Sequence, residues 1–154
     1  MPDAAADTLA LARHGYDVDF FLWTQEQAAR LRARADATLD WANLAEEIEG
    51  LGKRDRREVD SRLEVLLLHL VKWQYQREAR SAGWIGSIRE QRRNIERIVE
   101  DSPSLRQRPS ERLSRAYAVA RSQASIQMGL LGLDQLPVEC PFAIADVLRH
   151  DWLP

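Results

Sequence analysis

The chain has 154 residues, of which 45% are hydrophobic and 30% are charged, and its formal net charge is -2 at pH 7. This length fits one domain with its own core, and so small a net charge excludes the strong general attraction to nucleic acid or to an anionic membrane that a basic chain has. Cys140 is the only cysteine, which excludes an intrachain disulfide and a cysteine-rich zinc site.

Residues 1–15 are small, polar and rich in alanine, and we expect them to be a flexible N-terminal leader before a single helical domain over 16–154. The N-terminus lacks a positive leader followed by an apolar stretch, and no later run approaches the ~18 apolar residues that span a bilayer. The sequence therefore predicts a cytoplasmic protein without a membrane partner.

A first helix is predicted from Asp17 onward, with Asp17 or Asp19 as its N-cap. Its apolar face is marked by residues spaced three and four apart: Phe20, Trp23, Gln27 and Leu31. Phe21 and Ala28 widen this face, so we expect the helix to pack on the rest of the domain.

A second helix is predicted to begin at Trp41, capped by Thr38 or Asp40. Its core-facing arc is expected to hold Trp41, Leu44, Ala45, Ile48 and Leu51. Gly50 and Gly52 each cost about 1 kcal/mol relative to alanine inside a helix, so we expect a bend or a stop there.

The third helix follows the charged run 53–57 and is predicted to be central and buried, because apolar residues almost surround its axis. A fourth helix follows Gly83, and the prolines within 101–109 end it and start a fifth that runs to Gly129. A short proline-started helix closes the chain. No segment alternates with period two, so the fold class is all-α, a single-domain bundle of about five main helices plus a short C-terminal helix.

Three glutamates of the second predicted helix point in different directions. Glu46 faces solvent and lies three residues before Glu49, a spacing at which two carboxylates can share a hard cation such as Mg²⁺. Such pairs are commonplace on solvated helix faces, which is the favoured interpretation, and we expect no cofactor. Glu47 instead leans toward the interior.

His69 lies on a flank of the most buried predicted helix, where each ring nitrogen needs a partner. A carboxylate beside it would fix its tautomer and raise its pKa, as a general base requires, and Glu47 is the candidate partner. The alternative is a satisfied core histidine, since no motif ties a serine or cysteine nucleophile to His69.

The segment "KWQYQRE", residues 72–78, mixes aromatic and amide side chains as a binding surface does, so Lys72, Trp73 and Gln74 join the candidate polar site. Core packing with polar tips at the rim is the alternative. In residues 89–97 arginines alternate with glutamates, which favours intrahelical pairing on a solvated face over contacts with nucleic acid.

Four blocks resemble, in this order, the bacterial family catalogued as domain of unknown function, family 29: "LDWANLAEEIEGLGKRDRRE", "LLLHLVKWQYQ", "IREQRRNIERIVEDSPSLR" and "CPFAIADVLRHDWLP". The resemblance covers 16–154, and its motif residues lie within 40–49 and 69–74. Arg77 departs from it, because members often have proline after "KWQYQ". The resemblance implies an all-helical fold found largely in cyanobacteria and proteobacteria, and it implies no activity.

Two hypotheses of function follow from these observations. The leading one is a non-enzymatic helical interaction or oligomerisation module, in which polar residues around Glu47, His69 and Gln74 meet a second copy or another protein. The alternative is a small metal-dependent helical hydrolase that acts on a nucleotide-like substrate through Mg²⁺ held by Glu46 and Glu49. The sequence does not determine the substrate, the partner or the oligomeric state.

Overall fold

The computed structural model describes residues 16–18, 20–129 and 135–154. They form two compact units, one ending at Gly52 and the other covering Lys53–Pro154, and each unit is described by itself. All regular secondary structure in the described residues is helical, so the all-α class is confirmed. The predicted leader at 1–15 lies outside the described residues, and the single domain over 16–154 stays a prediction.

The first unit contains α2 (Phe20–Arg32), the 3₁₀ turn η1 (Asp36–Thr38) and the start of α3 (Trp41–Tyr75). Trp23 and Gln27 of the predicted first face are buried, whereas Leu31 is exposed. Of the two predicted N-caps, Asp17 lies in a turn before α2, and Asp19 lies outside the described residues.

Helix α3 is continuous over 35 residues, so the predicted break at Gly50 and Gly52 is wrong. A Cβ atom at either glycine would meet nothing within 4 Å, so no close contact requires a glycine there. Each glycine costs only about 1 kcal/mol. Because a helix that is already formed extends cooperatively through good helix formers on both sides, this cost does not end it.

The arc that was predicted to face the core at the start of α3 faces outward instead. Trp41, Ile48 and Leu51 are 59%, 68% and 53% exposed. The apolar residues of this arc do have helical spacing, but spacing alone does not determine whether another element covers them. In the first unit, no described element covers Trp41, Ile48 and Leu51.

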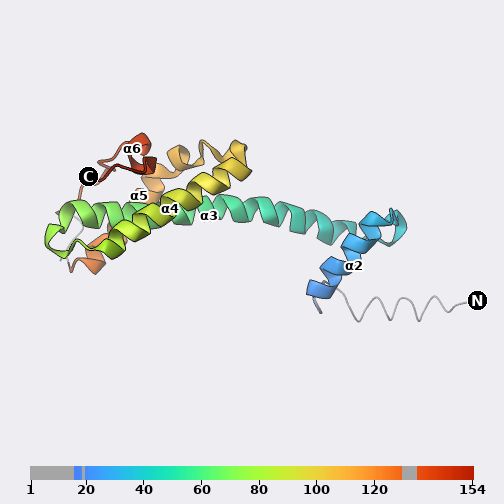
Figure 1. Ribbon diagram of the computed structural model, residues 1–154. Helices are drawn as coiled ribbons and strands as arrows, with labels where there is room; N and C mark the ends of the chain where they lie inside the picture. The colour runs from blue at the N-terminus through green and yellow to red at the C-terminus, as the bar shows by residue number, and fades with distance from the viewer. Residues whose placement is uncertain (1–15, 19, 130–134) are drawn as a thin grey trace, which may run out of the picture. The chain divides into compact units, whose positions relative to one another are not determined.

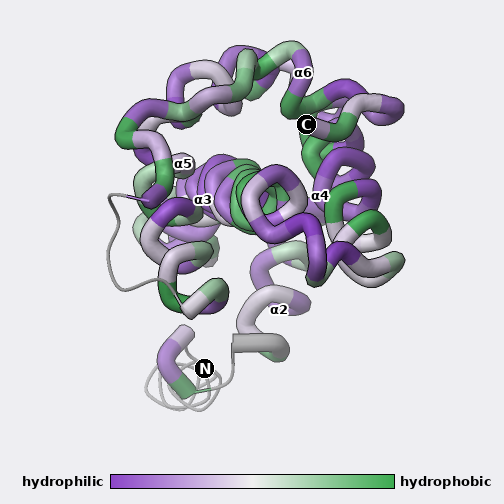
Figure 2. The backbone as a smooth tube through the Cα atoms, turned by 90° about the vertical axis from the view of Figure 1, so that its left-hand side faces the viewer, coloured by the Kyte–Doolittle hydropathy of each residue, from purple (hydrophilic) through white to green (hydrophobic). Residues whose placement is uncertain are grey.

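The second unit is built around the remainder of α3, with α4 (Ala82–Asp101), α5 (Arg108–Gln127) and the short α6 (Ile144–Leu148) (Figure 1). The 3₁₀ turns η2 (Arg77–Ala79) and η3 (Pro103–Leu105) link α3 to α4 and α4 to α5. Figure 2, which looks nearly along α3, shows α4 and α5 on either side of its hydrophobic centre.

The predicted burial of this part of α3 is confirmed, because seven of its apolar side chains are buried. They are Val59, Leu63, Leu66, Leu67, Leu68, Leu70 and Val71. From α5, Ala116, Tyr117, Ala120 and Ala124 pack into the same core. None of the helices in the described part of the chain is long and apolar enough to cross a membrane.

Local contacts explain where the helices of the second unit begin and end. The Ser81 hydroxyl accepts a hydrogen bond from the backbone N–H of Trp84 at 3.3 Å and caps α4. Helix α5 ends near Gly129, whose φ of 67° is a left-handed conformation that glycine adopts without strain. The Tyr117 hydroxyl then donates to the Pro137 carbonyl at 2.8 Å, which holds the segment after α5 against that helix.

Candidate functional site

Asp40 organises the start of α3. Its carboxylate accepts hydrogen bonds from the Asn43 side-chain amide at 2.8 Å, from the Trp23 indole N–H at 3.3 Å and from the Asn43 backbone N–H at 3.4 Å. Its own backbone N–H donates to Oε1 of the buried Gln27 at 2.9 Å. Of the two predicted caps, Asp40 rather than Thr38 therefore caps α3. Through Trp23 and Gln27, Asp40 also holds α2 against the start of α3 within the first unit.

The pKa of Asp40 is held below its ordinary value of 3.8, chiefly by the hydrogen bond from the Asn43 side chain and despite the opposing effect of burial. The ionised carboxylate therefore stabilises the folded state at pH values above 3.8, and this contribution is lost as the pH falls through the lower folded-state pKa. We expect Asp40→Ala to cost about 1 kcal/mol of local stability at neutral pH and to remove the acid sensitivity of the first turn of α3.

Amide hydrogen exchange at Asn43, compared at neutral pH and below pH 3.8, measures this effect. The matched control is Asp36→Ala, which removes an exposed carboxylate from η1 and should leave the protection of Asn43 unchanged. Equal protection of wild type and Asp40→Ala at neutral pH would contradict the assignment of Asp40 as the cap.

Glu47 does not contact His69. Its carboxylate accepts a short hydrogen bond from the Tyr16 hydroxyl, and this contact is the main reason that the pKa of Tyr16 rises from 10.0 to about 12. The Tyr16 ring also meets the Trp23 ring edge to face, with centroids 5.0 Å apart. Glu47 and His69 both belong to α3, about six turns apart at 3.6 residues per turn, so they do not face each other across a helix pair.

His69 lies on α3, half-buried on the side that faces Ser87 of α4. Its Nδ1 lies 2.8 Å from the Val65 carbonyl oxygen and 3.4 Å from the Ser87 hydroxyl. A carbonyl oxygen only accepts, so Nδ1 carries the proton and donates it to Val65. Nδ1 therefore cannot serve as a base for Ser87, and its hydrogen bond to Val65 agrees, at this one nitrogen, with the alternative of a satisfied core histidine.

Lys72 and Trp73 lie where the end of α3 meets its neighbours. The Lys72 ammonium donates to Oε1 of Gln127 at 2.9 Å and lies 4.4 Å from the centroid of the Trp84 ring. The Arg80 guanidinium lies 4.6 Å from the centroid of the Trp73 ring, and its Nε donates to the Trp73 carbonyl at 2.8 Å. Lys72 therefore ties α3 to α4 and α5, whereas Trp73 ties the end of α3 to the segment before α4. The next residue, Gln74, is half-buried.

The predicted metal pair consists of two exposed residues, Glu46 and Glu49. Within the described ranges, no group of three or more histidine, cysteine, aspartate or glutamate side chains is placed to hold a metal ion. The structure thus adds no further ligand to this pair.

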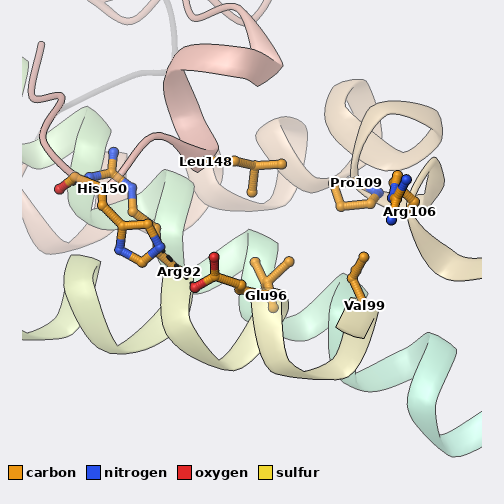
Figure 3. A pocket seen from close by; sticks show the side chains of 8 residues that line it. Arg92, Glu96, Val99, Arg106, Pro109, Leu148 and His150 are labelled. Carbon is orange, nitrogen blue, oxygen red and sulfur yellow. Dashed lines mark hydrogen bonds and ion pairs between the residues drawn. The ribbon is translucent and has the colours of Figure 1, made fainter. Parts of the chain in front are cut away.

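A cavity of about 210 Å³ opens between α4, the start of α5 and the segment after α6 (Figure 3). Its walls are mostly apolar, and a hydrogen bond between Nε2 of His150 and Oε2 of Glu96, 3.1 Å apart, lies at one end. Eight residues line it: Arg92, Ile95, Glu96, Val99, Arg106, Pro109, Leu148 and His150.

Arg92 is the unusual member of this cavity, because it is only 2% exposed. Its Nε donates to the Val147 carbonyl at 2.8 Å and its Nη1 to the His150 carbonyl at 3.4 Å, whereas its buried Nη2 has no hydrogen-bond partner. Burial lowers the pKa of this guanidinium. Sequence analysis placed Arg92 on a solvated face, and this is wrong because the chain after α6 returns over α4 and covers it.

The cavity has the shape to admit a small, mainly apolar molecule. Its volume lies below the ~300–1,000 Å³ of typical ligand sites, which argues against a nucleotide. The lining contains no serine, threonine or cysteine that could act as a nucleophile, and its histidine is paired with Glu96.

Comparison with known proteins identifies a family for this chain and nothing more specific. Neither curated proteins nor solved structures give a match. One family model matches nearly the whole chain, and its description names no activity. The resemblance carried by the four sequence blocks is therefore confirmed, and the chain belongs to the family described as Domain of unknown function DUF29, whose model matches residues 16–153.

Proposed function

We propose that this protein is a non-enzymatic helical interaction module that binds through an apolar stripe at the start of α3. We define the α3 stripe as Trp41, Leu44, Ile48 and Leu51. The observation that carries the proposal is the exposure of Trp41, Ile48 and Leu51, each more than half open to solvent. Clustered exposed apolar side chains mark interaction surfaces more often than isolated ones do.

The spacing of the α3 stripe suits another helix as its partner. Trp41 and Ile48 are seven residues apart, as are Leu44 and Leu51, and all four fall within an arc of roughly 80° at 100° per residue. This is the a/d pattern of a coiled-coil seam, which packs against a second helix. The exposed Gly52 lies beside the seam, and open space at its Cβ position lets a partner approach closely.

The partner we propose is a second copy of this chain. In an antiparallel pair, Trp41 of one copy lies against Leu51 of the other, and Leu44 lies against Ile48. The stripe then covers itself completely in one symmetric interface, as expected for a two-fold dimer. Each Å² of apolar surface removed from water contributes about 25 cal/mol, less the cost of association.

Light scattering coupled to size exclusion, across a concentration series, tests this proposal. Wild type should dimerise, and Ile48→Glu should weaken dimerisation by at least about tenfold, because a charge in the seam costs more than ~1.4 kcal/mol. Ile126→Glu is the matched control, since Ile126 is 77% exposed on α5. A wild type that stays monomeric, or a control that weakens the dimer equally, would refute the proposal.

A further inference from the structure

A basic hollow of about 310 Å³ lies between α3 and the start of α5, and every residue that lines it is a cation. We define the basic hollow as Lys53, Arg56 and Arg57 of α3 with Arg108 of α5. We propose that this hollow binds a small compound that carries two or more linked phosphate groups. The inference concerns the second unit alone and does not depend on the proposed dimer.

Two contacts hold the cations of the basic hollow in place. Arg108 makes a bidentate pair with Asp60, in which its Nε and Nη2 lie 2.8 and 2.6 Å from the two carboxylate oxygens. The Nε of Arg57 donates to the Lys53 carbonyl at 3.2 Å, so the Arg57 side chain lies back along α3 toward Lys53. A ligand would therefore meet two guanidinium groups whose positions are already restricted, which lowers the entropy cost of binding.

Two carboxylates, those of Asp60 and Glu111, act on Arg108 of the basic hollow. Asp60 serves two arginines, because Nε of Arg112 also lies 3.2 Å from its Oδ2. That second contact is an ion pair without hydrogen-bond alignment, and the buried Nε of Arg112 has no hydrogen-bond partner. The hydrogen bond to Asp60 is the main reason that the pKa of Arg108 is raised, and the charge of Glu111 adds to the effect. Arg56 and Arg57 of the hollow add two further positive charges, so Arg56, Arg57, Arg108 and Arg112 together outnumber these two carboxylates.

Helix α5 adds to the positive potential. It begins at Arg108, and its N-cap residue Gln107 makes no side-chain hydrogen bond to the first turn. The free backbone N–H groups of a helix start and the aligned peptide dipoles attract anions. This contribution reaches the same hollow as Arg108, because Arg108 is the first residue of the helix.

Phosphate is the anion that this arrangement fits. Arginine forks and lysine ammonium groups bind phosphate oxygens by charge-assisted hydrogen bonds, and several linked phosphates can engage several cations at once. The hollow is at the lower end of the ~300–1,000 Å³ of ligand sites, which favours a small ligand. A chain with a net charge of -2 offers no general attraction that would follow a nucleic-acid strand.

The test is a titration of the full-length chain with inorganic triphosphate, followed by calorimetry and by amide NMR shifts. Wild type should bind, and added salt should weaken binding strongly. Arg56→Gln/Arg57→Gln should weaken binding by at least about tenfold, the equivalent of ~1.4 kcal/mol. Both substituted residues are exposed, so the circular dichroism spectrum should not change.

The matched control is Arg89→Gln/Arg93→Gln, which removes the same two charges from an exposed face of α4. It should change triphosphate affinity by less than about twofold. No binding by wild type at low ionic strength would overturn the proposal, and so would equal losses in the two double variants. A single-stranded DNA oligonucleotide that binds more tightly than triphosphate at equal phosphate concentration would overturn the assignment of a small ligand.

Discussion

Replacing Leu66 by alanine is expected to lower the free energy of unfolding of the Lys53–Pro154 unit by about 2–5 kcal/mol. Leu66 is 0% exposed and belongs to the core cluster that α3 forms with α4 and α5. The loss combines the lost transfer of the leucine side chain out of water with the cavity that close-packed neighbours cannot fill. Denaturant unfolding followed by circular dichroism measures it.

The control for this experiment is Ile126→Ala on α5, which removes an apolar side chain of similar size that is 77% exposed. Its effect should stay within about 0.5 kcal/mol. If Leu66→Ala cost no more than Ile126→Ala, α3 would not be the central helix of this unit.

Asp60→Ala is expected to cost about 2–3 kcal/mol of unfolding free energy. The substitution removes the one carboxylate that pairs with both Arg108 and Arg112, and it leaves two guanidinium groups with little access to water. Breaking a fully buried pair costs ~3–5 kcal/mol. We expect less here, because the side chains of Asp60 and Arg108 keep 15% and 17% of their exposure.

Glu58→Ala is the matched carboxylate deletion two residues earlier on α3. Glu58 pairs with Arg62 at 3.2 Å, but both side chains are about a third exposed, so the loss should stay below about 0.5 kcal/mol. The same denaturant titration compares the two variants. Adding Arg108→Met to Asp60→Ala should recover part of the lost stability, because it removes the unpaired charge, and a further loss would contradict the ion-pair argument.

In α3, periodicity predicted the burial of one part of the helix correctly and that of another part wrongly. Over 59–71 the apolar residues surround the helix axis. Such a helix is stable only when other elements cover it on all sides, so its central position was predictable. Over 41–51 the apolar residues form one stripe, and a stripe is equally compatible with a core and with an exposed interface. The apolar spacing of 41–51 was therefore predicted correctly, but the burial of these side chains was not.

The candidate polar site was predicted from residue types, and the structure divides it. Pairing Glu47 with His69 assumed that Gly50 and Gly52 separated two helices that could turn and face each other. With α3 continuous, Glu47 bonds Tyr16 and His69 bonds the carbonyl one turn before it. The partners come from the turn before α2, from α4 and from α3 itself, and no spacing within one helix specifies them.

By itself the sequence determined the all-α class, the family and the buried part of α3, because these depend on short-range periodicity and on blocks read directly from the chain. It left the cap of α3 open between Thr38 and Asp40, and the hydrogen bonds of the structure decided for Asp40. Only the tertiary structure decided that Arg92 is buried, that Asp60 holds two arginines and that the α3 stripe is exposed. The reason is physical: burial and ion pairing depend on which distant segments meet, and that choice rests on the packing of the whole unit rather than on any local spacing.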